Sequence, residues 1–454
     1  MKKVIHFGVA KDIITPCTIT TMMGFGSVYG NTFEGIHDDL YVRTLLIRDS
    51  ICPIILISLD LCFHDDSLTE KLRSYAFEKY SIPSDNLLVI YTHTHFGPTV
   101  KGYHYTFCSQ EYEDFLYERI AQCIDRVFLN IYEGYIEYSS VEGDWNISRR
   151  HMVDGEMKFE PNLEGGRDKS IYLLKFCTVT GELKALLTSF ACHPSNLNAY
   201  RMISSEYPGR LCHLLEAQNY GCTVLFFQGC GADAKLKIGA KSSKFHPINH
   251  DECNEVANSM ALRVQNTLLN GKWMPIVPKF ASKMFQIKVP LEVYPISFFE
   301  KEAERFSVQK GKRFDTAMVD ANSNNSGKNS SLFMWACSQY IVDNYHDMPG
   351  FIMLNCSVIR LSEDLYIYIT GGEPSYDVKQ VLQQVKPEIK MLFFGYSDAI
   401  SYIPSDKMLE EGGYEAGDGS VTEYRLKGKI KHGIDSLLIS SFRNVIEQIE
   451  NGES

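Results

Sequence analysis

Two histidines follow an apolar run in the first quarter of the chain. The segment Tyr91-Thr-His-Thr-His-Phe-Gly-Pro98 comes directly after Leu87–Tyr91 and stops at a Gly-Pro turn. Residues two apart in an extended chain point the same way, so His93 and His95 can face one site at a strand end. Imidazoles are common metal ligands, although this spacing fits two surface histidines equally well.

A third histidine has a similar setting. Ser189-Phe-Ala-Cys-His-Pro194 is an apolar stretch that ends in His193 and a proline. Taken alone, His193 fits a loop histidine as well as a ligand. Its strand-end position favours a site residue, because α/β proteins gather their sites there, and Ser204-Ser-Glu-Tyr-Pro-Gly209 then opens a helix next to it.

Three further segments end in small or polar residues. Phe226–Asp233 runs into glycines, Leu365–Thr370 precedes Gly371-Gly-Glu-Pro374, and a tyrosine-rich stretch runs from Tyr396 through Tyr402 to Gly413-Tyr-Glu415. Glycines let a ligand approach the backbone closely, but they also make ordinary turns. No spacing rule joins these segments.

The elements that must position these residues alternate between short apolar runs and amphipathic helix-length segments. This pattern predicts an α/β fold with mixed β-sheets flanked by helices. The polar stretch Asn322–Ser331 predicts a surface loop. The expected strands are Pro53–Asp60, Leu87–Tyr91, Ile136–Val141, Ile171–Phe176, Ala185–Cys192, Thr223–Gln228, Phe351–Arg360, Leu365–Thr370 and Met391–Gly395. The expected helices are Ser67–Tyr80, Gln110–Leu129, Tyr207–Gln218, Asp251–Leu269, Phe298–Gln309, Tyr376–Val385 and Gly433–Glu450.

Composition excludes several classes of protein. The formal net charge of −11 argues against a nucleic-acid binder, and 44% hydrophobic residues can form a large core. No secretory signal and no run of about 18 apolar residues is present, so we expect no stable membrane association. The 13 cysteines form no CxxC or CxxH motif, which predicts reduced thiols in the cytoplasm.

Taken together and in this order, the segments resemble the catalytic domain of the neutral/alkaline non-lysosomal ceramidase family, zinc amidases that cleave the N-acyl bond of ceramide. The similar motifs are Gly8-Val-Ala-Lys-Asp-Ile-Ile-Thr-Pro16, Met22-Met-Gly-Phe25, Thr92-His-Thr-His-Phe-Gly-Pro98 and Gly413-Tyr-Glu415. The resemblance spans nearly the whole chain and predicts the family's catalytic fold as one domain over residues 1–454, without the family's C-terminal immunoglobulin-like domain.

The resemblance implies a zinc ion bound by His93, His193, Glu373 and Tyr402. The family has a Y-x-T-T segment at the last position, where this chain has Tyr402-Ile-Pro-Ser405. The assignment of Tyr402 is supported by a second tyrosine twelve residues later, because the family has a substrate-carbonyl tyrosine at that separation.

The resemblance also implies four catalytic residues. His95 would handle protons, Arg149 in Ile147-Ser-Arg-Arg150 would be the active-site arginine, and Tyr414 would donate to the developing oxyanion. The family's active-site serine is replaced by Lys235. This lysine could hold a carboxylate or phosphate of the substrate, stabilise charge, act as a neutral amine, or simply face solvent.

These residues predict a zinc-dependent hydrolase of a C–N bond in an N-acyl amide. Zinc with an open coordination position lowers the pKa of its bound water and polarises a carbonyl, so metal-bound water is expected to attack the acyl carbon. A cytoplasmic, acidic, one-domain protein of bacterial type suits a small soluble substrate better than ceramide in a bilayer.

Several alternatives stay open. The same fold could form or cyclise amides, with Lys235 redirecting the acyl group from water. The protein could also be a true ceramidase, a non-catalytic zinc-binding homologue, or a hydrolase of peptides or lactones. The sequence does not identify the acyl and amine parts of the substrate, and it leaves open whether the chain forms a homo-oligomer.

Overall fold

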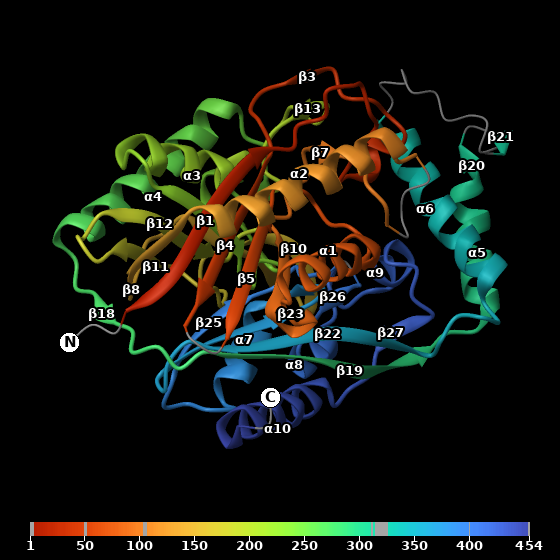
Figure 1. Ribbon diagram of the computed structural model, residues 1–454. Coiled ribbons are helices and arrows are strands. Elements are labelled where there is room, and N and C mark those ends of the chain that lie inside the picture. The colour runs from red at the N-terminus through yellow and green to blue at the C-terminus, as the bar shows by residue number, and fades with distance from the viewer. Residues whose placement is uncertain are drawn as a thin grey trace.

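The computed structural model describes residues 4–49, 52–102, 107–309, 312–313, 326–398 and 400–452. Its two largest sheets lie face to face, with helices on both outer faces (Figure 1). The predicted α/β class with mixed sheets is confirmed. Within the described ranges, no helix is long and apolar enough to cross a membrane.

The larger sheet has nine strands, in the order β14-β12-β11-β8-β1-β4-β5-β6, with β18 paired to β8. The pairs β5/β6 and β12/β14 are parallel, and the other neighbours are antiparallel. The strands are β1 Ile5–Ile13, β4 Tyr41–Arg48, β5 Pro53–Leu59, β6 Leu87–Tyr91, β8 Ile131–Glu142, β11 Ser170–Thr178, β12 Leu183–Phe190, β14 Thr223–Gln228 and β18 Met274–Pro275.

The second sheet has five strands, in the order β25-β23-β22-β19-β27, and only β23/β25 is parallel. It packs against the larger sheet through a shared apolar core, in which the rings of Phe227 and Phe394 stack 4.9 Å apart. Its strands are β19 Ala281–Val293, β22 Phe351–Arg360, β23 Leu365–Thr370, β25 Lys390–Phe394 and β27 Gly428–Ile430.

The most continuous apolar runs among the predicted strands, such as those in β5, β6 and β23, are buried on both faces. In β6, Leu88 and Ile90 face the second sheet, whereas Leu87, Val89 and Tyr91 pack beneath the helices. Such strands read as continuous apolar runs rather than as alternating patterns.

Helices cover both outer faces of the two-sheet core. α1 Asp66–Tyr80, α2 Gln110–Leu129, α3 Glu206–Gln218 and α4 His250–Asn270 pack on the larger sheet. α7 Tyr376–Gln383 and α10 Ile434–Asn451 pack on the second sheet. The remaining helices are α5 Ile296–Ser307, α6 Ser326–Asn344, α8 Asp406–Glu411 and α9 Asp418–Glu423, with short helical turns at Gly26–Val28, Ser84–Asn86 and Lys237–Gly239.

The remaining strands form small sheets and pairs outside the two large sheets. They are β2 Met22–Met23, β3 Gly35–Ile36, β7 Gly97–Pro98, β9 Asn146–Val153, β10 Glu156–Asn162, β13 Met202–Ile203, β15 Ala234–Leu236, β16 Ala240–Lys241, β17 Lys244–Phe245, β20 Val308–Gln309, β21 Lys312–Arg313, β24 Glu373–Pro374 and β26 Tyr402–Ile403. Two pairings matter for the site: β24 pairs with β26, and β9 lies between β10 and β15.

One prediction is wrong. Residues 322–325 of the expected loop Asn322–Ser331 lie outside the described residues, but Ser326–Ser331 form the start of α6. The helix continues with Leu332, Phe333, Cys337 and Ile341, whose buried side chains recur on one face. Helix stability comes mostly from such an apolar face, so the polar first turns did not prevent helix formation.

Candidate functional site

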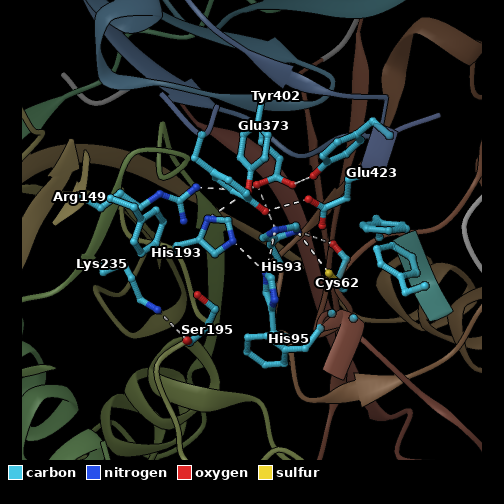
Figure 2. A pocket seen from close by; sticks show the side chains of 18 residues that line it. Cys62, His93, His95, Arg149, His193, Ser195, Lys235, Glu373, Tyr402 and Glu423 are labelled. Carbon is cyan, nitrogen blue, oxygen red and sulfur yellow. Dashed lines mark hydrogen bonds and ion pairs between the residues drawn. The ribbon is translucent and has the colours of Figure 1, made fainter. Parts of the chain in front are cut away.

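A cavity of about 390 Å³ opens where the ends of the two sheets meet the short strands. All eight residues predicted from the sequence line it, as Figure 2 shows for most of them. They are His93, His95, Arg149, His193, Lys235, Glu373, Tyr402 and Tyr414.

His93 lies directly after β6 in a left-handed backbone conformation, with φ of 65°. Its amide donates to the carbonyl of Leu61 over 3.0 Å, and its ring Nδ1 lies 2.8 Å from the carbonyl oxygen of Cys62. Nδ1 therefore donates, and Nε2 is directed at Oε2 of Glu373, 3.3 Å away. Burial lowers the pKa of His93, but Cys62 and Glu373 outweigh it and raise the pKa well above its ordinary value, so this position favours positive charge.

His193 follows the end of β12, and its amide donates to the carbonyl of Ala234 over 2.9 Å. Its ring Nδ1 lies 3.7 Å from Oε2 of Glu373. Burial, and then the charge of Arg149, lower the pKa of His193 well below 6.5. The imidazole is therefore neutral at pH 7, which is the form that binds metals.

Glu373 is positioned by the pairing of β24 with β26. Its amide donates to the carbonyl of Ser401 over 2.8 Å, and the pairing sets Glu373 beside Tyr402. The preceding Gly372 has φ of 66° and lies so close to Ser401 that a Cβ atom would come within 2.5 Å of its carbonyl oxygen. A side chain at position 372 would therefore disturb the turn that holds Glu373.

The three groups fit a bound cation. Ligand atoms of His93, His193 and Glu373 all lie within 4.8 Å of one another. Oε2 of Glu373 and Nδ1 of His193 are buried and make no hydrogen bond within the described chain. An unsatisfied buried polar atom costs about 1–3 kcal/mol, and a divalent ion between these atoms would satisfy both. Nitrogen and oxygen ligands are what zinc commonly takes.

His95 and Tyr402 lie next to this group. Nε2 of His95 is 3.2 Å from Nε2 of His93 and 2.8 Å from Nε2 of His193. Burial, and then the charge of His93, lower the pKa of His95 well below 6.5. The hydroxyl of Tyr402 accepts a hydrogen bond from Nη2 of Arg149 over 3.2 Å.

The remaining predicted residues have specific partners. Nε of Arg149 donates to Oε1 of Glu415 over 2.8 Å. The hydroxyl of Tyr414 donates to Oε2 of Glu423 over 2.8 Å. Nζ of Lys235 donates to the carbonyl oxygen of Ser195 over 3.0 Å. Lys235 therefore faces the cavity rather than solvent.

The structure adds three residues that sequence reasoning missed. The carbonyl of Cys62 orients His93, the hydroxyl of Tyr424 donates to Oε1 of Glu373, and Glu423 lines the cavity beside Tyr414. Burial raises the pKa of Glu423 to about 7. Cys62 comes just after a predicted strand, and this strand-end position could have marked it as a site residue. Glu423 and Tyr424 lie at the end of α9, which no sequence pattern marks.

Comparison with known proteins gives a consistent picture. Residues 6–229 match the family model described as neutral/alkaline non-lysosomal ceramidase, N-terminal. The fold is similar to the crystal structure of neutral ceramidase from Pseudomonas aeruginosa, with a TM-score of 0.70 and 15% sequence identity over 99% of this chain and 75% of that one. It is also similar to a ceramidase complexed with C2, with a TM-score of 0.70 and 16% identity over 99% and 76% of the two chains. The resemblance stated from the motifs is therefore confirmed: residues 6–229 match the model of the neutral/alkaline non-lysosomal ceramidase N-terminal domain, and nearly the whole chain has the fold of solved ceramidases.

Proposed function

We propose that this protein is a zinc-dependent hydrolase that cleaves the C–N bond of a small, soluble N-acyl amide. The observation that carries the proposal is the convergence of two buried imidazoles and a buried carboxylate in the cavity, with two of their polar atoms unsatisfied. His93, His193 and Glu373 would hold the ion, with Tyr402 as the fourth ligand. The family assignment supports amide cleavage as the reaction class.

The bound ion would supply Lewis acidity, polarising the acyl carbonyl and lowering the pKa of a water molecule. The chain's own residues would do the rest. His95 is neutral and lies within hydrogen-bond distance of His193, so it can accept a proton and pass it to the leaving amine. Tyr414 has a hydroxyl in the cavity, and it would exchange its hydrogen bond to Glu423 for one to the developing oxyanion.

The place of the family's serine is taken by Lys235, so this position offers an ammonium group and no hydroxyl. The proposed hydrolysis therefore uses water as the nucleophile. We further propose that residues 1–454 act as one domain, because one apolar cluster is shared by both sheets. We also propose that the protein works in the cytoplasm, because all 13 cysteines are free.

A mass-spectrometric screen of N-acyl amides tests this function. Wild type supplied with zinc should release acid and amine from at least one member, and His93→Ala should not. His346→Ala, which changes an exposed histidine, is the matched control and should keep activity. Zinc binding with amide formation, or with no turnover of any amide, would contradict hydrolysis and favour a synthetic or binding role.

A further inference from the structure

We propose that the cavity selects substrates that carry a carboxylate, which Lys235 binds beside the three histidines. This inference rests on the proposed function and names the substrate class of the same site. The occupant would be an N-acyl amide with one anionic end and one apolar end.

Lys235 is placed for this role by the small sheet that borders the cavity. Lys235 on β15 lies opposite Ile147 on β9, and Arg149 is two residues further along β9. Because side chains alternate along a strand, Lys235, Ile147 and Arg149 share one face of this sheet. Figure 2 shows Arg149 and Lys235 on one side of the three histidines, and Glu423 and Cys62 on the other.

The same sheet is fixed directly to the proposed metal ligands. The carbonyl of Ala234 accepts the amide of His193 over 2.9 Å, and the carbonyl of Asp233 accepts the amide of Arg149 over 2.8 Å. Lys235, the next residue of β15, is thereby held beside His193. A carboxylate bound to Lys235 would leave the acyl carbonyl of the same molecule near the histidines.

Lys235 has no ion-pair partner among the described residues, although the carboxylate of Glu206 acts on it from beyond ion-pair distance. Nζ donates to the carbonyl of Ser195, and no carboxylate of the described chain forms an ion pair with it. Arg149 and Arg150, in contrast, are neutralised by Glu415 and Glu411. An ammonium group has three donors, so two remain to bind an anion.

The pKa of Lys235 agrees with an unpaired cation. Burial, followed by repulsion from Arg149, lowers it to about 8. The group is still mostly protonated at pH 7. A substrate carboxylate would relieve this repulsion, and a charge-assisted hydrogen bond in a partly buried site is stronger than one in water. The single positive charge of Lys235 matches the single charge of a carboxylate.

Aromatic rings provide the other part of the lining. Phe25, Phe63, Phe159 and Phe333 border the cavity, and the ring of Phe25 lies 4.8 Å from that of His95. Apolar surface of this kind favours an acyl chain or another hydrophobic group. The cavity therefore combines the ammonium group of Lys235 with aromatic rings around the proposed reaction centre, and one of these rings, Phe159, packs on Arg149.

The test compares two ligands that differ only in the anionic group. In N-(octylsulfonyl)glycine and its primary amide a sulfonamide replaces the N-acyl bond, so isothermal titration calorimetry can measure their binding to the zinc-supplied protein once mass spectrometry has shown that the primary amide stays intact. Wild type should bind the acid about tenfold or more tightly than the amide, and Lys235→Met should bring this ratio close to one. Lys235→Arg should restore most of the ratio. Lys237→Met is the matched control, because Lys237 pairs with Asp144 away from the cavity, and it should keep the wild-type ratio.

The corresponding kinetic test uses N-octanoylglycine and N-octanoylglycinamide. The ratio of their kcat/KM values should favour the acid in wild type and fall about tenfold or more in Lys235→Met. Equal binding of the two sulfonamides to wild type, or an unchanged ratio in Lys235→Met, would overturn the inference. Selective binding of the acid without hydrolysis would support the inference and refute the proposed function. Hydrolysis without preference for the acid would support the proposed function and refute the inference.

Discussion

The ring Nδ1 of His93 lies 2.8 Å from the carbonyl oxygen of Cys62, and this contact fixes which nitrogen of His93 faces the cavity. Because Nδ1 donates to the carbonyl, Nε2 is the ring nitrogen that faces Glu373 and the cavity. Such hydrogen bonds set the tautomer and orientation of metal-binding histidines. His93 also has φ of 65°, a conformation that costs about 1–3 kcal/mol in a residue with a side chain and is concentrated at functional sites.

Tyr424→Phe should weaken metal binding without removing a ligand. The hydroxyl of Tyr424 donates to Oε1 of Glu373 and so orients the carboxylate. Loss of such a contact typically costs about 10- to 100-fold in metal affinity, which competition with a zinc chelator measures. Tyr220→Phe, at a fully exposed tyrosine (100%), should have no effect. Equal affinities of Tyr424→Phe and wild type would show that Glu373 needs no such support.

Glu415→Gln should destabilise the fold strongly. Glu415 binds Arg149 and Arg150 through separate oxygens, each over 2.8 Å, and is itself buried. Removing one partner of a buried ion pair costs about 3–5 kcal/mol, because charge is left uncompensated. Urea denaturation should show this loss, whereas Glu363→Gln, in an exposed pair with Lys279, should cost less than about 1 kcal/mol. Similar effects of the two substitutions would refute the role given to Glu415.

Stability should depend on pH through His64. This buried histidine lies 2.8 Å from Glu113, and it follows Cys62 closely in the loop that orients His93. Burial lowers its pKa, but hydrogen bonds to Asp65 and Glu113 outweigh burial and raise it from 6.5 to about 9. Since the pKa is raised in the folded state, the stabilisation is fully present below pH 6.5 and is lost as the pH rises through 9.

Glu113→Gln removes part of the stabilisation that protonated His64 provides, so it tests this pH dependence. Its free energy of unfolding should be about 1–3 kcal/mol below that of wild type at pH 6, and the gap should narrow by pH 9.5. Denaturation curves across this range measure the gap. A gap that stays constant with pH would mean that the His64 pair does not titrate as described.

Gly24→Ala should abolish activity through His95. Gly24 has φ of 109°, and a Cβ atom there would lie 2.5 Å from the Cα atom of His95. Gly155→Ala is a matched control, because Gly155 has φ of 80° but no atom within 4 Å of the added Cβ. Both substitutions should cost about 1–2 kcal/mol of stability from the backbone conformation, and only Gly24→Ala should also displace His95. Full amidase activity in Gly24→Ala would contradict this account.

The sequence predicted most strands that read as continuous apolar runs. It missed β4, which is buried on both faces but contains Arg43 and Thr44, and several strands that are buried on one side only. β19 has Ile287, Val289 and Leu291 buried on one side only, and β1 contains Lys11 and Asp12 near its end. Their mixed patterns are weaker signals than the continuous apolar runs of β5 or β6.

The site residues were predictable only through their order along the chain. His93 and His193 follow strands of the larger sheet, whereas Glu373 follows β23 of the second sheet. Nothing local in the sequence shows that these two sheets pack together, so the resemblance had to supply the grouping. The contacts of Glu423 and Tyr424 depend on the same packing and carry no local pattern.

Metal content tests the central claim most directly. Wild type, His93→Ala, His193→Ala and the control His346→Ala should be purified with zinc supplied and analysed by elemental mass spectrometry. The account predicts about one zinc ion per chain in wild type and His346→Ala, and a loss of most of it in the other two variants. Wild-type protein without metal, or variants of His93 and His193 that retain it, would contradict the proposed centre.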